Sequence, residues 1–216
     1  MLHDWEYERP ILSRYLDPLE LIWLACCRQL GMHVRRDSNI FSMTDGTGLL
    51  ALGTRKDLDP DDTVCQMVFH EICHWITNGI DSFEVRDWGF PLDGEMDQRE
   101  HACQRLQAAL SDAHGLRGMM AATGIFRQYY DQIPEDPFEP REEAAEWESE
   151  VIRIAREAYE RAQHAPFHEP IQKALKATVV LRELVRPFLQ DYQTDLEDDQ
   201  LPSWWDRNQE WRSLDL

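Results

Sequence analysis

The stretch from Asp59 to Gly79 is DPDDTVCQMVFHEICHWITNG, and its pattern predicts a buried helix. Asp59 is a typical N-cap residue, Pro60 suits the first helical position, and Gly79 is a typical residue at a helix end. Apolar side chains lie on nearly every side of this helix, from Val64 to Ile76. A helix that is apolar nearly all round belongs in the core of a protein.

A narrow polar stripe on this helix contains His70, Glu71 and His74. Residues four apart on a helix are rotated by only about 40° and lie one turn apart. Both imidazoles can therefore reach one cation at the roughly 2.0–2.1 Å of a zinc–nitrogen bond. Glu71 would lie beside that metal, where a carboxylate can take a proton from the water that the metal activates. We therefore predict His70 and His74 as metal ligands and Glu71 as a catalytic residue; the alternative is a surface stripe with two solvated histidines.

A third ligand must come from elsewhere, because a catalytic zinc normally has three protein ligands. The best candidate is Glu100, in the first turns of a helix predicted from Asp97 to about Asp112. On a helical wheel Glu100 flanks the apolar stripe of this helix, whereas His101 points nearly opposite, toward water. The alternative is that Glu100 is only a first-turn acid favoured by the helix dipole. The remaining candidates are His101, Asp87, Asp97, Asp93, Glu95 and His114.

Two parts of the sequence carry a resemblance to a known superfamily. Asp59-Pro60-Asp61-Asp62 leads into His-Glu-x-x-His-Trp, and Glu100 later opens Glu-x-x-Cys-Gln-x-Leu-Gln-Ala-Ala-Leu. This arrangement resembles the zincin metallopeptidases of the gluzincin type. The resemblance implies a zincin-like fold in which His70, His74 and Glu100 bind zinc and Glu71 acts as the general base.

A narrower resemblance lies in residues 70–79 followed by Asp87-Trp88-Gly89-Phe90. This stretch is similar to the elongation factor P hydroxylase family. That family has a His-Glu-x-x-His-Trp motif, then Gly, then an Asp-aromatic-Gly-aromatic element. Two histidines and one carboxylate are also the ligand set of non-haem Fe(II) oxygenases. The resemblance therefore implies an iron-dependent hydroxylase that acts on a protein side chain.

Glu71 favours hydrolysis over hydroxylation, because oxygenation has no obligatory use for a carboxylate beside the metal. The sequence thus predicts a zinc-dependent metallopeptidase or a peptidase-like hydrolase. The alternatives are the Fe²⁺-dependent hydroxylase and a non-catalytic zincin-like interaction domain.

The remaining segments predict an α+β fold, with a small antiparallel sheet packed on the motif helix and a mostly helical C-terminal half. Asp45-Gly46-Thr47-Gly48 is a strong hairpin signal. Helical periodicity and cap residues predict the other helices at 17–30, 97–112, 118–130, 144–162 and 171–188. Strands are predicted at 32–35, 40–44 and 49–52, and a proline-rich loop at 131–140.

The chain length is consistent with two arrangements of domains. In the first, residues 1–130 form the zincin-like metal-binding core and residues 131–216 form a helical extension packed on it. In the second, residues 1–216 form a single domain. The tail is acidic but contains Trp204, Trp205 and Trp211. Because disordered tails are usually poor in tryptophan, we expect part of the tail to dock.

Composition restricts the partners of the chain. The net charge is −19, from 22 basic and 41 acidic residues, and a field of that sign repels nucleic acid and anionic lipid. No long apolar run or N-terminal h-region predicts a membrane span or a secretory signal. The five cysteines have irregular spacing, which fits a reducing cytoplasm. We expect a cytoplasmic protein with a peptide or protein substrate; the sequence predicts no oligomeric state.

Two further features of a peptidase are predicted less directly. A peptide substrate can add to an exposed strand edge, and the candidate segment is Leu49 to Leu52. A donor to the tetrahedral oxyanion is also expected. The candidates for this donor are Tyr129, Tyr130, Arg127 and His114.

Overall fold

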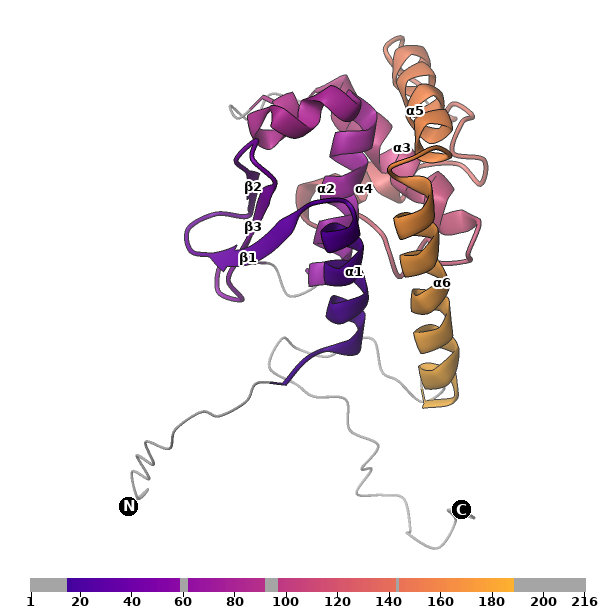
Figure 1. The fold of residues 1–216 in the computed structure, drawn as a ribbon. Coiled ribbons are helices and arrows are strands. Elements are labelled where there is room, and N and C mark those ends of the chain that lie inside the picture. Colours follow the sequence, from indigo (N-terminus) through magenta and orange to yellow (C-terminus); the bar gives the residue numbers. More distant parts are fainter. Residues whose placement is uncertain (1–14, 59–61, 92–96, 143, 189–216) are drawn as a thin grey trace, which may run out of the picture.

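The computed structural model describes residues 15–58, 62–91, 97–142 and 144–188. In these segments a small three-stranded sheet lies on one side of a group of helices (Figure 1). The α+β class predicted from the sequence is therefore confirmed. None of the helices in these segments combines the length and apolar character that crossing a bilayer requires.

The sheet consists of β1 (His33–Asp37), β2 (Ser42–Thr44) and β3 (Leu49–Gly53), in the order β1-β3-β2. The hairpin is confirmed, since β2 pairs antiparallel with β3. The prediction of a wholly antiparallel sheet is wrong, because β1 pairs parallel with β3. After β1, the chain forms β2 at a distance that leaves room for one more strand. It then turns back, and β3 fills the gap between β1 and β2. The segment Leu49 to Leu52 is therefore central, paired on both sides, and is no edge for a substrate.

Helix α2 (Val64–Asn78) carries the motif and is largely buried. It begins later than predicted, because Thr63 is still extended and its Oγ1 accepts a hydrogen bond from the backbone N–H of Gln66. The predicted cap at Asp59 lies outside the described residues. The end at Gly79 is confirmed, and its φ of 95° is a conformation that glycine adopts without the steric cost of a Cβ.

Other long helices pack around α2, either directly or on one of its neighbours. Helix α1 (Pro18–Gln29) is capped by Asp17 as predicted, and α3 (Gln98–Asp112) is capped by Asp97. Helices α5 (Glu148–Ala162) and α6 (His168–Val185) match the two amphipathic helices predicted in the C-terminal half. Helix α2 contacts α1, α3 and α5, and α6 packs on α1. A short 3-10 turn, η4 (Arg186–Phe188), follows α6. The three tail tryptophans lie outside the described residues.

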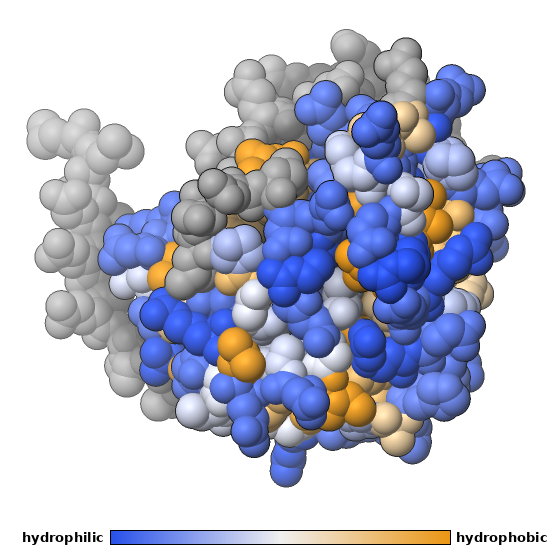
Figure 2. Space-filling view, turned by 90° about the horizontal axis from the view of Figure 1, so that it is seen from above, coloured by the Kyte–Doolittle hydropathy of each residue, from blue (hydrophilic) through white to orange (hydrophobic). Residues whose placement is uncertain are grey.

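The surface of the molecule is rich in polar side chains, as expected for a chain with many charged residues. Seen from above, the surface is largely hydrophilic, with separate hydrophobic patches between the polar side chains (Figure 2). The apolar side chains of α2 instead form the centre of the main core cluster. The motif helix is therefore a core helix, as its all-round apolar pattern predicts.

The predicted helix 118–130 is mostly absent. The structure has only the 3-10 turn η3 (Gly124–Phe126) and the single-turn helix α4 (Arg127–Tyr130) in this range. Gly124 has a φ of 60°, which an α-helix cannot contain. Two further 3-10 turns, η1 (Ile80–Glu84) and η2 (Arg86–Gly89), follow α2. The loop predicted at 131–140 is confirmed.

A buried ion pair connects α3 to α5 and to the loop between α4 and α5. Arg105 is fully buried, and its guanidinium bonds to the carboxylate of Glu148. The same guanidinium donates to Tyr129 Oη at 2.7 Å and to the backbone oxygens of Pro137 and Glu139 at 2.5 and 2.8 Å. Because these partners come from three segments, Arg105 fixes the position of α3 on the side that faces away from α2.

Replacing Arg105 by Met should lower the free energy of unfolding by about 3 kcal/mol, because the buried, charged Glu148 keeps only Arg141 as an ionic partner. The double variant Arg105→Met/Glu148→Leu should recover much of that loss, since it removes both charges. Urea unfolding at neutral pH measures both effects. The control is Arg153→Met, which breaks exposed pairs with Glu150 and Glu157 and should have a much smaller effect. Equal losses in both single variants would contradict this assignment.

Candidate metal centre

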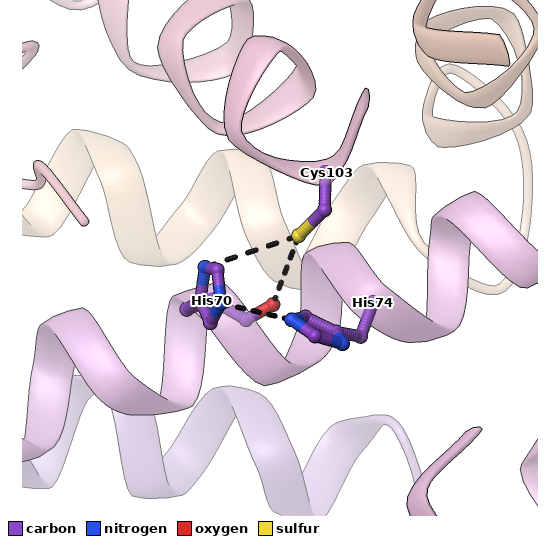
Figure 3. A group of neighbouring side chains, drawn as sticks. All are labelled: His70, His74 and Cys103. Carbon is purple, nitrogen blue, oxygen red and sulfur yellow. Dashed lines mark hydrogen bonds between the residues drawn. The ribbon is translucent and has the colours of Figure 1, made fainter. Parts of the chain in front are cut away.

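The two histidines of the motif face each other on successive turns of α2. His70 Nε2 and His74 Nε2 are 2.8 Å apart, and the ring centroids are 4.5 Å apart. Figure 3 shows both rings on the side of α2 that faces α3. The four-residue spacing therefore brings two imidazole nitrogens together, as predicted.

Glu100 completes a group of three potential ligands. Its Oε1 lies 3.1 Å from His70 Nε2 and its Oε2 lies 3.2 Å from His74 Nε2. Four ligands at zinc–ligand distances of roughly 2.0–2.1 Å in a tetrahedron lie about 3.3 Å from one another. The two distances to Glu100 are close to this value, and the 2.8 Å between the histidine nitrogens is somewhat shorter, so small side-chain shifts would let all three bind one cation. Asp97, the N-cap of α3, sets the start of the helix that presents Glu100.

Gln107 determines which nitrogen of His70 faces this group. Gln107 Nε2 donates to the backbone oxygen of Met120 at 2.7 Å, so its Oε1 is the atom 2.9 Å from His70 Nδ1. An amide oxygen only accepts, so Nδ1 carries a hydrogen and Nε2 of the neutral ring offers its lone pair to a metal. Orientation of ligand histidines by such partners is usual in metal sites.

Cys103 is a second candidate for the third ligand. His70, His74 and Cys103 form a group whose ligand atoms lie within 4.8 Å of one another and could hold a metal ion. The Sγ atom is 3.9 Å from His70 Nδ1 and 3.6 Å from the His70 backbone oxygen (Figure 3). It thus faces the nitrogen that Gln107 engages, whereas Glu100 faces Nε2. The sequence assigned Cys103 to the core, where it does lie, but its contact with His70 was not predicted.

The charges of the cluster favour Glu100 over Cys103. Burial disfavours a charged Glu100, yet the positive charges of His74 and His70 hold its pKa well below the usual range. Burial also opposes protonation of His70, but Glu100 and Glu71 raise its pKa to about 9. Burial, with the neighbouring Cys73, raises the pKa of the Cys103 thiol well above its ordinary value. The Glu100 carboxylate is therefore ready to bind a cation, whereas the Cys103 thiol, like the protonated His70 ring, must first lose a proton.

The carboxylate of Glu71 is held by two donors from outside α2. Ser42 Oγ, in β2, donates to Oε1 at 2.5 Å, and Trp88 Nε1, in η2, donates to Oε2 at 2.9 Å. Asp87 fixes η2 to β2, because its Oδ1 accepts from the backbone N–H of Thr44 at 2.9 Å. The Asp87-Trp88-Gly89 element singled out in the sequence therefore supports Glu71, and Asp87 is occupied away from the histidines.

A pocket of about 250 Å³ opens over the cluster. It is lined by Phe41, Ser42, Gln66, Met67, His70, Glu71, His74, Phe90, Pro91, Asp97, Glu100, Ala121, Ala122, Thr123, Ile125 and Phe126. The three predicted ligands and the predicted base therefore share one opening. The oxyanion candidates Tyr129, Tyr130, Arg127 and His114 are not among the lining residues. Asp93 and Glu95, two candidates for the third metal ligand, lie outside the described residues.

The prediction that His101 points to water is wrong. Its side chain is buried and stacks on Tyr129 at 3.9 Å and on Trp147 at 5.0 Å between ring centroids. Tyr129 in α4 and Trp147 before α5 cover the side of α3 that a helical wheel assigns to solvent. His101 is not among the residues at the pocket, so Glu100 remains the better candidate ligand on α3.

Comparisons with known proteins do not assign the chain to a family: no family model, curated protein or solved structure matches it.

The third ligand can be identified by measuring zinc affinity. Glu100→Ala should lower it by at least about 100-fold, the upper end of the roughly 10–100-fold losses typical of groups that only orient a ligand. Cys103→Ala should lower it by less than about tenfold. Competition with a chromogenic chelator, on protein first stripped of metal, gives both values. Cys65→Ala is the control, because Cys65 is also buried but contacts Thr63. A larger loss for Cys103→Ala than for Glu100→Ala would assign the ligand to sulfur.

Proposed function

We propose that this chain is a metal-dependent hydrolase, most simply a zinc metallopeptidase that acts on a peptide or protein substrate. The observation that carries the proposal is the convergence of His70 Nε2, His74 Nε2 and the Glu100 carboxylate to within 3.2 Å. Glu71 lines the same pocket beside them.

The residues fit a bound divalent cation. Glu100 Oε1 is buried without a hydrogen-bond partner, although it lies 3.1 Å from a histidine nitrogen. A buried carboxylate oxygen without a partner is costly, and a metal bond would satisfy it. Two imidazole nitrogens and one carboxylate oxygen are a usual ligand set of catalytic zinc, which keeps a fourth position open. The pocket supplies space at that position.

A bound zinc ion would activate water and polarise the carbonyl group of the substrate. The chain itself supplies the base. Ser42 and Trp88 each donate one hydrogen bond to a different oxygen of Glu71. Each carboxylate oxygen has two lone pairs, so Glu71 can still accept a proton at the pocket and pass it to the leaving amine. The two donors also stop the carboxylate from rotating away from the pocket.

The same ligand set serves iron oxygenases, so an Fe²⁺-dependent side-chain hydroxylase is the alternative. The position of Glu71 supports hydrolysis instead. An oxygenase needs open positions for dioxygen and substrate and has no obligatory use for a base at this place. A fold that used the metal only as a structural support would have no use for this base either.

Substituting Glu71 by Gln should abolish peptide cleavage and leave metal bound, because the amide keeps the shape of the side chain but cannot take up the proton. Cleavage is measured by mass spectrometry on a mixture of peptides of known sequence, with zinc-loaded protein. We expect a rate loss of at least about 100-fold, the lower end of what general-base catalysis contributes. Glu169→Gln, at an exposed position on α6, is the control and should retain the full rate.

Metal analysis of protein purified without added metal completes this test. Stoichiometric zinc supports the hydrolase. Stoichiometric iron, together with a Glu71→Gln variant that is as active as the parent chain, would replace the hydrolase by the hydroxylase.

A further inference from the structure

We propose that the pocket over the metal centre binds a bulky, uncharged apolar side chain of the substrate and excludes carboxylate groups. The inference rests on the proposed function, because it assumes that the substrate reaches the metal through this pocket. Its basis is the chemistry of the walls, which combine large apolar side chains with acidic ones.

The large side chains in the walls of the pocket are mostly apolar and come from separate segments of the chain. Phe41 precedes β2, Met67 lies in α2, Phe90 follows η2, and Ile125 and Phe126 belong to η3. Phe90 packs on the ring of His74 at 4.1 Å, and Phe126 stacks on the ring of His70 at 6.2 Å between centroids. An apolar side chain that enters next to the histidines would therefore contact hydrocarbon on several sides.

Two of these wall residues are unusually exposed. Ile125 is 83% exposed and Phe41 is 45% exposed, and neither is among the residues packed against the core clusters. Both line the pocket, and their exposure places them where it meets the solvent. Removing a large apolar side chain from water lowers the free energy. Covering Phe41 and Ile125 would therefore stabilise a bound substrate.

Among the described residues, the lining of the pocket offers no Lys or Arg side chain to a substrate carboxylate. Besides the two histidines, the ionisable side chains among its described lining residues are Glu71, Asp97 and Glu100, all acidic. The nearby Arg99 pairs with Asp97 and also donates to Asn78 Oδ1 and the Gly89 backbone oxygen. Glu71 and Glu100 together offset the two charges of a divalent metal. A substrate carboxylate would therefore lose its hydration without gaining an ionic partner.

The size of the pocket limits what can occupy it. Its volume of about 250 Å³ is below the roughly 300–1,000 Å³ typical of small-molecule sites. One large side chain with the adjoining backbone is a suitable occupant. The described lining also has no Lys or Arg side chain to bind a terminal carboxylate. Both features favour cleavage within a chain, next to a residue such as Leu or Phe, over removal of a residue from a carboxyl terminus.

Hydroxamates of different side chains test the inference by binding alone. Acetohydroxamic acid carries only the metal-binding group, 3-phenylpropionohydroxamic acid adds an apolar ring, and the monohydroxamate of succinic acid adds a carboxylate. Each is titrated calorimetrically into the zinc-loaded and the metal-free full-length chain. We expect the phenyl compound to bind at least about tenfold more tightly than acetohydroxamic acid, as burial of an aromatic side chain predicts. The succinic compound should bind no more tightly than acetohydroxamic acid.

A variant at the pocket mouth separates this specificity from general hydrophobic binding. Ile125→Lys should reduce the preference for the phenyl compound and strengthen binding of the succinic compound by at least about threefold, because it adds a cation to an exposed position of the wall. Val180→Lys is the matched control, since Val180 is 59% exposed on α6 outside the pocket. It should leave all three affinities unchanged.

The two proposals fail in different ways in this experiment. If acetohydroxamic acid does not bind the zinc-loaded chain, the metal is not open to a substrate and the proposed function is wrong. If it binds but the phenyl compound binds equally well or less tightly, the proposed function stands and the apolar side-chain site is wrong. Tighter binding of the succinic compound than of the phenyl compound would also overturn the inference.

Discussion

The contact between α2 and α3 is the constraint on which the candidate metal centre depends. Cys73 and Cys103, both fully buried, interact where these two successive helices pack. Because interiors are packed without large voids, this contact leaves little freedom in how α3 lies along α2. A shift of one helical turn is about 5.4 Å and would remove Glu100 from the histidines. The ligand geometry is therefore a product of apolar packing, with Gln107 adding one polar contact to His70.

The opposite side of α3 is fixed by polar contacts. Arg105 is fully buried among backbone oxygens, Tyr129 and Glu148, and Arg141 Nε approaches the same carboxylate at 3.0 Å. Buried ion pairs are weak sources of net stability, but a wrongly placed partner leaves an uncompensated charge. Such a network penalises alternative positions of α3 more than it stabilises the native one. Apolar packing toward α2 and ionic contacts away from it thus restrict the helix that carries Glu100 from both sides.

The sequence predicted the parts of the centre that depend on one helix and missed those that depend on distant segments. The spacing of His70 and His74 and the wheel position of Glu100 follow from helical geometry alone, and the structure brings these residues together. His101 was misplaced because a wheel based on one apolar stripe cannot detect a second covering surface. The parallel pairing of β1 with β3 depends on the path of the chain between strands, which local patterns do not contain. The donors to Glu71 come from β2 and η2, and no spacing rule connects them to α2.

The surroundings of Glu71 bear most directly on the choice between hydrolysis and a structural role. Asp87 and Trp88 have φ values of 49° and 54°, and such left-handed conformations cost non-glycine residues of order 1–3 kcal/mol each. This conformation accompanies the placement of the Trp88 indole N–H against the Glu71 carboxylate and of Asp87 against the edge strand. Strain of this kind persists only where surrounding contacts enforce it, and it is concentrated at functional sites. A centre that needed only His70, His74 and Glu100 to hold a metal would gain nothing from this arrangement, whereas a base that must stay oriented beside the metal gains that orientation from the two donors.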